Sequence, residues 1–347
     1  MSNEIFVAGV AVSLGILFYW GFRVLPQDKW QFLAAIPRQQ LADGSWQAIN
    51  LTYYGLFNAL AHVIALSILL ILTGSIGIPE YNVILIMLVM MGTCLPASRL
   101  LARWIEKKAH TFTVGGASFV GIILGPAAVW LVYRTIFPNA LIPWLPLLAA
   151  MAIAYAVGEG VGRLACISFG CCYGKPVVSG DTWFNRLCQR YAFIFTGTTK
   201  KVAYEGRLAG QKVFPIQAVT ATILIGAALA GIYLFLSGSY GLSFFLTILV
   251  TQLWRLLSEI FRSDHRGGGS LSAYQLMALL ALPYTVVICF FLPPAAIVAN
   301  ILNGLESLWK PGTMLFIQAW GAAIFWYTGN SRVTGAQISF HVFRDRI

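Results

Sequence analysis

The chain has 347 residues, of which 59% are apolar and 10% are charged, and its formal net charge is +11. A soluble globular domain carries about 25% charged residues, so this composition excludes that class and predicts a polytopic membrane protein. The excess of Lys and Arg indicates membrane orientation and contact with anionic lipid headgroups. It is not accompanied by a basic and aromatic binding pattern, so we expect no nucleic-acid partner.

Apolar segments of roughly 20 residues, the length that crosses a bilayer, recur along the whole chain. The first begins at Ile5 with no basic residue before it and no small-residue cleavage site after it, so we expect an uncleaved span. The predicted spans are 5–22, 50–74, 82–102, 113–136, 141–161, 215–237, 241–262, 271–292 and 312–328. The expected fold is therefore an all-α polytopic membrane protein.

Most polar segments between these spans are short, and only 162–214 is long enough to form a small lobe. We expect three regions along the chain. They are an N-terminal span with its linker (1–49), a membrane core that includes the lobe (50–292), and a C-terminal addition with the candidate ninth span (293–347). If the spans alternate in direction, all Lys and Arg except Arg134, Arg255 and Lys310 lie on the side of the lobe. The positive-inside rule would place that side in the cytoplasm.

Charged residues inside apolar spans, or at their ends, are costly, so each is a candidate functional residue. Arg255 and Glu259 lie four residues apart in WRLLSEIFR, and Arg262 follows on the same helical stripe. Two interpretations are open. The pattern is typical of an ion pair that fixes helix packing, and also of a guanidinium that holds a phosphate through its planar pair of donors, which is the favoured interpretation.

Arg163 lies in GEGVGRLACISFGCCYGKP (158–176), which contains five glycines and three cysteines. Such glycines allow close helix packing or the approach of backbone amides to a ligand, and the arginine among them favours a ligand site. Cys166, Cys171 and Cys172 follow a C-x4-C-C spacing, which does not match the paired cysteines of structural zinc sites. We therefore expect no metal and no cofactor. Buried packing is the expected role of the thiols, and a catalytic thiol stabilised by Arg163 is the alternative.

Four sequence blocks resemble the prolipoprotein diacylglyceryl transferase family, in the family's order. LTYYGLFNAL is similar to its early Tyr-Gly-Leu block, and LPASRLLARWIE with VGGASFVGIILG to its Gly-Ala-Arg turn and its Gly-Gly-x-Ser helix. GEGVGRLACISFGCCYGKP resembles the Gly-Arg signature of a divergent branch that carries Cys-Cys-Tyr-Gly. FPIQAVTA and LWRLLSEIFRSDHRGGGSLSAYQ resemble its His-Pro-x-Gln block and its closing helix. The similarity extends over about 50–292.

This resemblance implies a seven-helix core in the cytoplasmic membrane, with the lobe between core helices four and five. It also implies transfer of a diacylglyceryl group from phosphatidylglycerol to the thiol of a lipoprotein-precursor cysteine. Arg163 and Arg255 would be the catalytic pair that holds the phosphate and stabilises the leaving group. The implied substrate-binding residues are Tyr54, Arg99, Gly162, Gly174, Glu259 and Arg262. The expected partners are an anionic phospholipid, the membrane, and a lipoprotein precursor or another acceptor.

The chain departs from the family pattern in the half of the site that would receive the acceptor. Val120 and Phe214 stand where the family has histidines. Cys166 replaces an asparagine, and Cys171 replaces an acidic residue. Two alternatives are therefore open: a paralogue that uses a different acceptor, and a non-catalytic lipid transporter. The family's lobe also faces outside the cytoplasm, opposite to the side that the charge distribution predicts.

Overall fold

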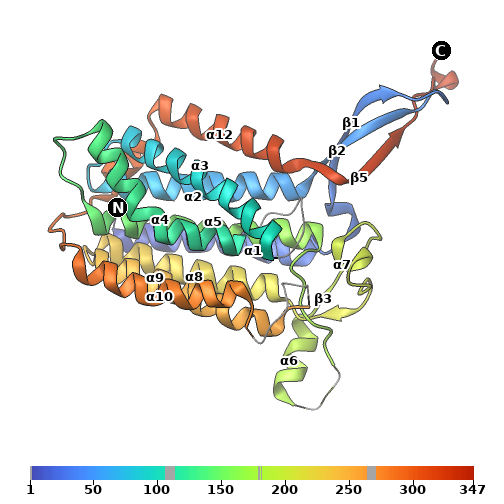
Figure 1. The fold of residues 1–347 in the computed structure, drawn as a ribbon. Coiled ribbons are helices and arrows are strands. Elements are labelled where there is room, and N and C mark those ends of the chain that lie inside the picture. Colours follow the sequence, from blue (N-terminus) through green and yellow to red (C-terminus); the bar gives the residue numbers. More distant parts are fainter. Residues whose placement is uncertain (1, 106–113, 179, 181, 264–270) are drawn as a thin grey trace.

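The computed structural model describes residues 2–105, 114–178, 180, 182–263 and 271–347, and long helices dominate it (Figure 1). Within this described part, eight helices are long and apolar enough to cross a membrane. They are α1 (Asn3–Val24), α2 (Tyr53–Ser75), α3 (Glu80–Ile105), α4 (Val114–Ile136), α5 (Trp144–Phe169), α8 (Ile216–Leu236), α9 (Tyr240–Ser258, continued by the 3-10 turn Glu259–Phe261) and α10 (Ala273–Phe291). The all-α polytopic class is confirmed. Most of the predicted loops at 103–112 and 263–270 lies outside the described residues.

Helix α5 lies inside the bundle and packs against α2, α8 and α9 (Figure 1). Small side chains allow this close packing, since Ala149, Ala150 and Ala156 are fully buried. Most of α5 is buried in this way, including Arg163 close to its C-terminal end. A charged side chain on α5 therefore meets other helices rather than lipid.

Helix α5 continues eight residues beyond the predicted span end at 161, so Arg163 and Cys166 lie on the helix and not in the lobe. The expectation that the lobe begins at 162 was wrong, because the glycines of this stretch serve helix packing. Gly158 packs against Ala65, and Gly160 against Ile225. The helix ends at Gly170, whose φ of +73° is the left-handed conformation that favours glycine.

The lobe occupies 170–215, and its described residues form short elements. They are α6 (Trp183–Tyr191), β3 (Phe193–Ile194), α7 (Lys201–Tyr204) and β4 (Lys212–Val213), with β3 and β4 paired antiparallel. The lobe is attached to the bundle through the end of α5, where the Val202 N–H donates to the Gly170 carbonyl at 2.9 Å. It therefore positions the segment that follows Gly170.

Lys200 is a polar link between the lobe and the bundle, and its side chain is fully buried. Its Nζ donates to the Ser168 carbonyl at 2.6 Å and to the Leu25 carbonyl at 3.0 Å. These carbonyls lie at the C-terminal ends of α5 and α1, where a cation is favoured by the helix dipole. Burial lowers the pKa of Lys200 to about 8, partly offset by Asp28. The ammonium thus joins two helix ends to the lobe.

A three-stranded antiparallel sheet outside the bundle was not predicted. Its strands are β1 (Phe32–Gln40), β2 (Trp46–Thr52) and β5 (Asn330–Ile338), in the order β1-β2-β5. The short 3-10 turns Asp28–Trp30 and Arg344–Arg346 lie near this sheet in the chain. The predicted linker 23–49 therefore contains a hairpin that pairs with the C-terminal tail. Strand β1 is exposed and contains Pro37, which a strand tolerates only at a sheet edge.

The C-terminal addition forms α11 (Ile301–Leu308) and α12 (Pro311–Gly329), which together follow α2 along its length. Gly304 packs against the backbone of Ile71 near one end of α2, and Gly329 against Gly55 at the other. Helix α12 is not among the eight apolar helices, but it joins one end of the bundle to the sheet at the opposite end (Figure 1). The predicted ninth span stays a proposal, which this arrangement supports.

Candidate functional site

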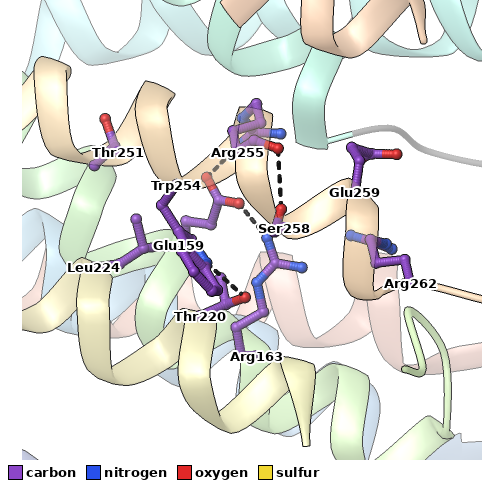
Figure 2. Close-up of a pocket in the computed structure, with 10 residues that line it drawn as sticks. All are labelled: Glu159, Arg163, Thr220, Leu224, Thr251, Trp254, Arg255, Ser258, Glu259 and Arg262. Carbon is purple, nitrogen blue, oxygen red and sulfur yellow. Dashed lines mark hydrogen bonds and ion pairs between the residues drawn. The ribbon is translucent and has the colours of Figure 1, made fainter. Parts of the chain in front are cut away.

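Side chains from α5, α8, the C-terminal end of α9 and the turn that follows it converge on one pocket (Figure 2). The pocket is lined by Glu159, Arg163, Thr220, Leu224, Thr251, Trp254, Arg255, Ser258, Glu259 and Arg262. Three arginines face two glutamates here, so the lining carries one net positive charge at neutral pH. A net positive pocket within a membrane bundle favours an anionic ligand.

Glu159 is the centre of this pocket because its carboxylate binds both buried arginines. Oε1 accepts from Nη2 of Arg163, and Oε2 accepts from Nη2 of Arg255 at 2.5 Å. The Tyr155 hydroxyl donates to the same Oε2 at 2.6 Å and accepts from Arg255 Nη2 at 3.0 Å. The three charged side chains are each less than a tenth exposed. The carboxylate therefore fixes two guanidiniums beside each other.

Both arginines retain a donor that this network does not use. The Nε atoms of Arg163 and Arg255 are buried, and neither has a hydrogen-bond partner in the described part of the chain. Leaving a buried donor unsatisfied costs about 1–3 kcal/mol, and more when it is charged. A ligand that supplies acceptor oxygens, as a phosphate does, would satisfy both donors.

Helix α4 approaches Arg255 through a glycine. A Cβ added at Gly115 would lie 3.0 Å from Nη1 of Arg255 and 2.9 Å from the ring of Tyr274. Only a residue without a side chain therefore leaves the guanidinium in its position. Gly115 belongs to VGGASFVGIILG, but no pattern in that block marks this glycine as the neighbour of an arginine.

The structure brings together four of the eight site residues predicted from the sequence. Arg163, Arg255, Glu259 and Arg262 all line the pocket. Arg255, for which an ion pair on its own helix was one interpretation, binds Glu159 of α5. The cluster of Glu159 with the two arginines is therefore compatible with both interpretations, a structural ion pair and a ligand site.

The other four predicted residues lie outside the pocket lining. Gly174 is in the loop after α5, where it forms an isolated β-bridge with Arg262 and packs on the backbone of Phe214. A Cβ added at Gly162 would lie 3.9 Å from Ala61, an ordinary contact distance.

Tyr54 and Arg99 do not line the pocket, and each makes an aromatic contact elsewhere. Tyr54 packs edge-on against Phe169, with ring centroids 5.6 Å apart. Arg99 is exposed on α3, and its guanidinium lies 5.4 Å from the ring centre of Tyr327 on α12. A substrate-binding role for these two residues stays a prediction.

Sequence reasoning missed the bridging role of Glu159 and the contribution of Tyr155. Their spacing could have indicated these roles, because Tyr155, Glu159 and Arg163 follow one another at intervals of four residues. This spacing places all three side chains on one face of a helix. Trp254 was also missed. Its Nε1 donates to Thr220 Oγ1 at 3.0 Å and links α9 to α8 beside the pocket.

The fold and the pocket define a polytopic membrane protein with a buried arginine pair suited to an anionic ligand. The family model of prolipoprotein diacylglyceryl transferases matches residues 45–291, which is most of the chain and contains helices α2 to α10. The chain therefore belongs to the prolipoprotein diacylglyceryl transferase family, and the resemblance seen in the sequence is confirmed. Among proteins of curated function, none matches this chain.

Proposed function

We propose that this protein moves a diacylglyceryl group from phosphatidylglycerol to the thiol of a lipoprotein-precursor cysteine, in the cytoplasmic membrane. Membership of the family supports a transferase of this kind. The observation that carries the choice of donor is the pair of buried guanidiniums with unused Nε donors. Phosphatidylglycerol offers a phosphodiester with two free oxygens, which suits this pair.

The depth of the pocket also favours a lipid headgroup. Arg163 lies six residues before the end of α5, which is about 9 Å along the axis at 1.5 Å per residue. Arg255 lies three residues before the end of α9. Both positions lie in the last two turns of their helices, which we expect to be just inside the membrane surface. The phosphate could therefore meet the arginines while the acyl chains remain among lipid-facing helices.

The proposed reaction is a displacement at carbon. The acceptor thiol gives its proton to solvent and its sulfur forms a bond to the glyceryl carbon. The bond from that carbon to the phosphate oxygen breaks, and glycerol phosphate leaves with the electron pair. Negative charge grows on the phosphate as this bond breaks. Arg163 and Arg255, held by Glu159 in a water-poor site, are placed to stabilise that charge.

Purified protein, phosphatidylglycerol and a lipobox peptide test this proposal directly. We expect wild-type protein to yield a peptide heavier by one diacylglyceryl group. Arg163→Ala and Arg255→Ala should each reduce the yield by at least about 10²-fold, as expected for loss of one stabilising group. Arg134→Ala, at the far end of α4, is the matched control and should retain activity. Full activity in both pocket variants would end the proposal.

A second candidate keeps the donor and changes the acceptor, and the replacement of both family histidines by Val120 and Phe214 favours it. Lipid and lipoprotein analysis of cells with and without the protein separates the two. Unchanged lipoproteins together with the loss of another lipid species would favour the second candidate. A lipid-transport role would instead appear as flux across proteoliposomes without chemical change of the lipid.

A further inference from the structure

Three thiols meet where α5 ends, although their spacing in the sequence does not match a structural zinc site. The Sγ atoms of Cys166, Cys171 and Cys172 all lie within 4.8 Å of one another, and the three residues are half-buried. Three sulfurs bound to one tetrahedral Zn²⁺ lie about 3.8 Å apart, given Zn–S bonds of about 2.3 Å. Shifts of the sulfur atoms by up to about 1 Å, through side-chain rotation, would thus bring the three thiols to the spacing of zinc ligands.

The backbone explains how this cluster forms. The N–H of Gly170 donates to the Ile167 carbonyl, and the N–H of Cys171 donates to the Cys166 carbonyl at 3.0 Å. This pair of bonds is the Schellman ending of a helix, which sets the residues at its two outer positions side by side. Those residues are Cys166 and Cys171. An apolar contact between them is common in such endings, so two of the thiols need no further explanation.

The helix ending does not explain the position of the third thiol, that of Cys172. Cys172 has a φ of +55°, a left-handed conformation that is uncommon for residues other than glycine. The loop is held from α8, where Gln217 Nε2 donates to the Cys171 carbonyl at 2.9 Å. The other end of the Gln217 amide, Oε1, is buried and has no partner among the described residues. Packing of three small apolar side chains would not require this conformation.

The cluster continues the line of site residues on α5. Glu159, Arg163 and Cys166 follow at intervals of four and three, so they share one helix face, with Cys166 a turn beyond Arg163. The loop then folds back, because the β-bridge of Gly174 with Arg262 fixes it to the end of α9. A group bound at the three sulfurs would therefore lie next to a phosphate held by Arg163.

We propose that Cys166, Cys171 and Cys172 bind a divalent cation of the zinc class and that its fourth position receives the acceptor thiol. This role in the reaction rests on the proposed transferase function. Catalytic zinc sites use three protein ligands and keep one position for a substrate. Bound thiols are deprotonated by the metal, which would replace the base that Val120 does not provide.

The step balances without an oxidant. The acceptor thiol gives its proton to solvent when its sulfur binds the cation, and that sulfur then forms the bond to the glyceryl carbon. The bond from carbon to phosphate oxygen breaks, and the electron pair leaves on glycerol phosphate. Direct attack by one of the three cysteines would instead give a stable thioether on the enzyme. A thioether is a poor leaving group, so the role of ligand is chemically the productive one.

Metal content tests the site independently of transfer. Full-length protein is purified under reducing conditions, loaded with Zn²⁺ or Co²⁺, and freed of excess metal. We expect one equivalent per chain, and for Co²⁺ the intense near-ultraviolet absorption of thiolate coordination. Cys166→Ser, Cys171→Ser and Cys172→Ser should each lower the affinity by at least tenfold. Cys289→Ser, on α10, is the matched control and should retain the metal.

The outcomes separate the two proposals. Arg163→Ala should bind Co²⁺ like the wild type while losing transfer, and a cysteine-containing acceptor peptide should shift the Co²⁺ spectrum where its serine analogue does not. Wild-type protein that stays folded by thermal melting, transfers the lipid group and binds no metal overturns this inference and leaves the transferase intact. Metal binding without a spectral response to the peptide overturns the acceptor role.

Discussion

Replacing Gly115 by alanine tests whether the position of Arg255 limits the reaction. The new Cβ would lie 3.0 Å from Arg255 Nη1 and 2.9 Å from the Tyr274 ring. Heavy atoms in favourable contact are about 3.5–4.0 Å apart, so the guanidinium or the ring must move by a few tenths of an ångström, up to about 0.5 Å. Arg255 is the easier group to displace, because the contacted Nη1 is the far end of a long, flexible side chain, whereas the Tyr274 ring is fully buried.

The expected loss follows from how steeply rate depends on placement. A 1 Å misplacement of a reacting group costs about 10²-fold, so a shift of half that size predicts about a tenfold lower kcat/KM for phosphatidylglycerol. This corresponds to about 1.4 kcal/mol of transition-state stabilisation. The matched control is Gly121→Ala on the same helix, where a Cβ would meet Cys94 and Met90 at ordinary distances of 3.5 and 3.6 Å.

The assay is the initial rate of peptide modification at several phosphatidylglycerol concentrations, with thermal melting to show that both variants fold. The Gly121 variant should stay within about twofold of the wild type, since alanine in place of glycine inside a helix costs nothing intrinsically. Equal rates for the Gly115 and Gly121 variants would refute the reasoning, because the arginine would then tolerate displacement.

Three other changes test separate parts of the structure. Glu159→Gln removes the carboxylate shared by two buried arginines, so the free energy of unfolding should fall by about 3–5 kcal/mol; an unchanged melting temperature in detergent would contradict this. Arg163→Lys keeps the charge but loses the planar pair of donors, so kcat/KM should fall by about 10²-fold or more, whereas near-normal activity would mean that a point charge suffices. Lys200 has a folded pKa of about 8 against an ordinary value of 10.5, so only the unfolded chain holds the proton between these values. The stability of wild type relative to Lys200→Met should therefore rise by about 1.4 kcal/mol per pH unit from pH 8 to 10.5, and a flat difference would exclude the shift.

The membrane core and half of the site could be predicted from the sequence, for clear physical reasons. Apolar length defines a span without knowledge of its neighbours, so the seven core helices and α1 were found. Arg163 and Arg255 stood out because charge inside an apolar segment is rare and costly. Both residues line the pocket, together with Glu259 and Arg262.

The remaining features depend on contacts between distant parts of the chain. The glycines near Arg163 were compatible with helix or loop, and only the neighbours Ala65 and Ile225 decide for helix. The sheet joins 32–52 to 330–338, a pairing that no local pattern encodes. The cysteine cluster depends on the helix ending at Gly170, which spacing rules for zinc ligands do not consider.

The central claim is that the buried arginine pair serves the transfer of a diacylglyceryl group from a phospholipid. Its most direct measurement follows glycerol phosphate release and peptide mass in the same reaction, with phosphatidylglycerol as donor. We predict one glycerol phosphate released for each peptide that gains a diacylglyceryl group, and neither product with Arg163→Ala or Arg255→Ala. Peptide modification that persists in both variants, or glycerol phosphate release without any modified peptide, would contradict the claim.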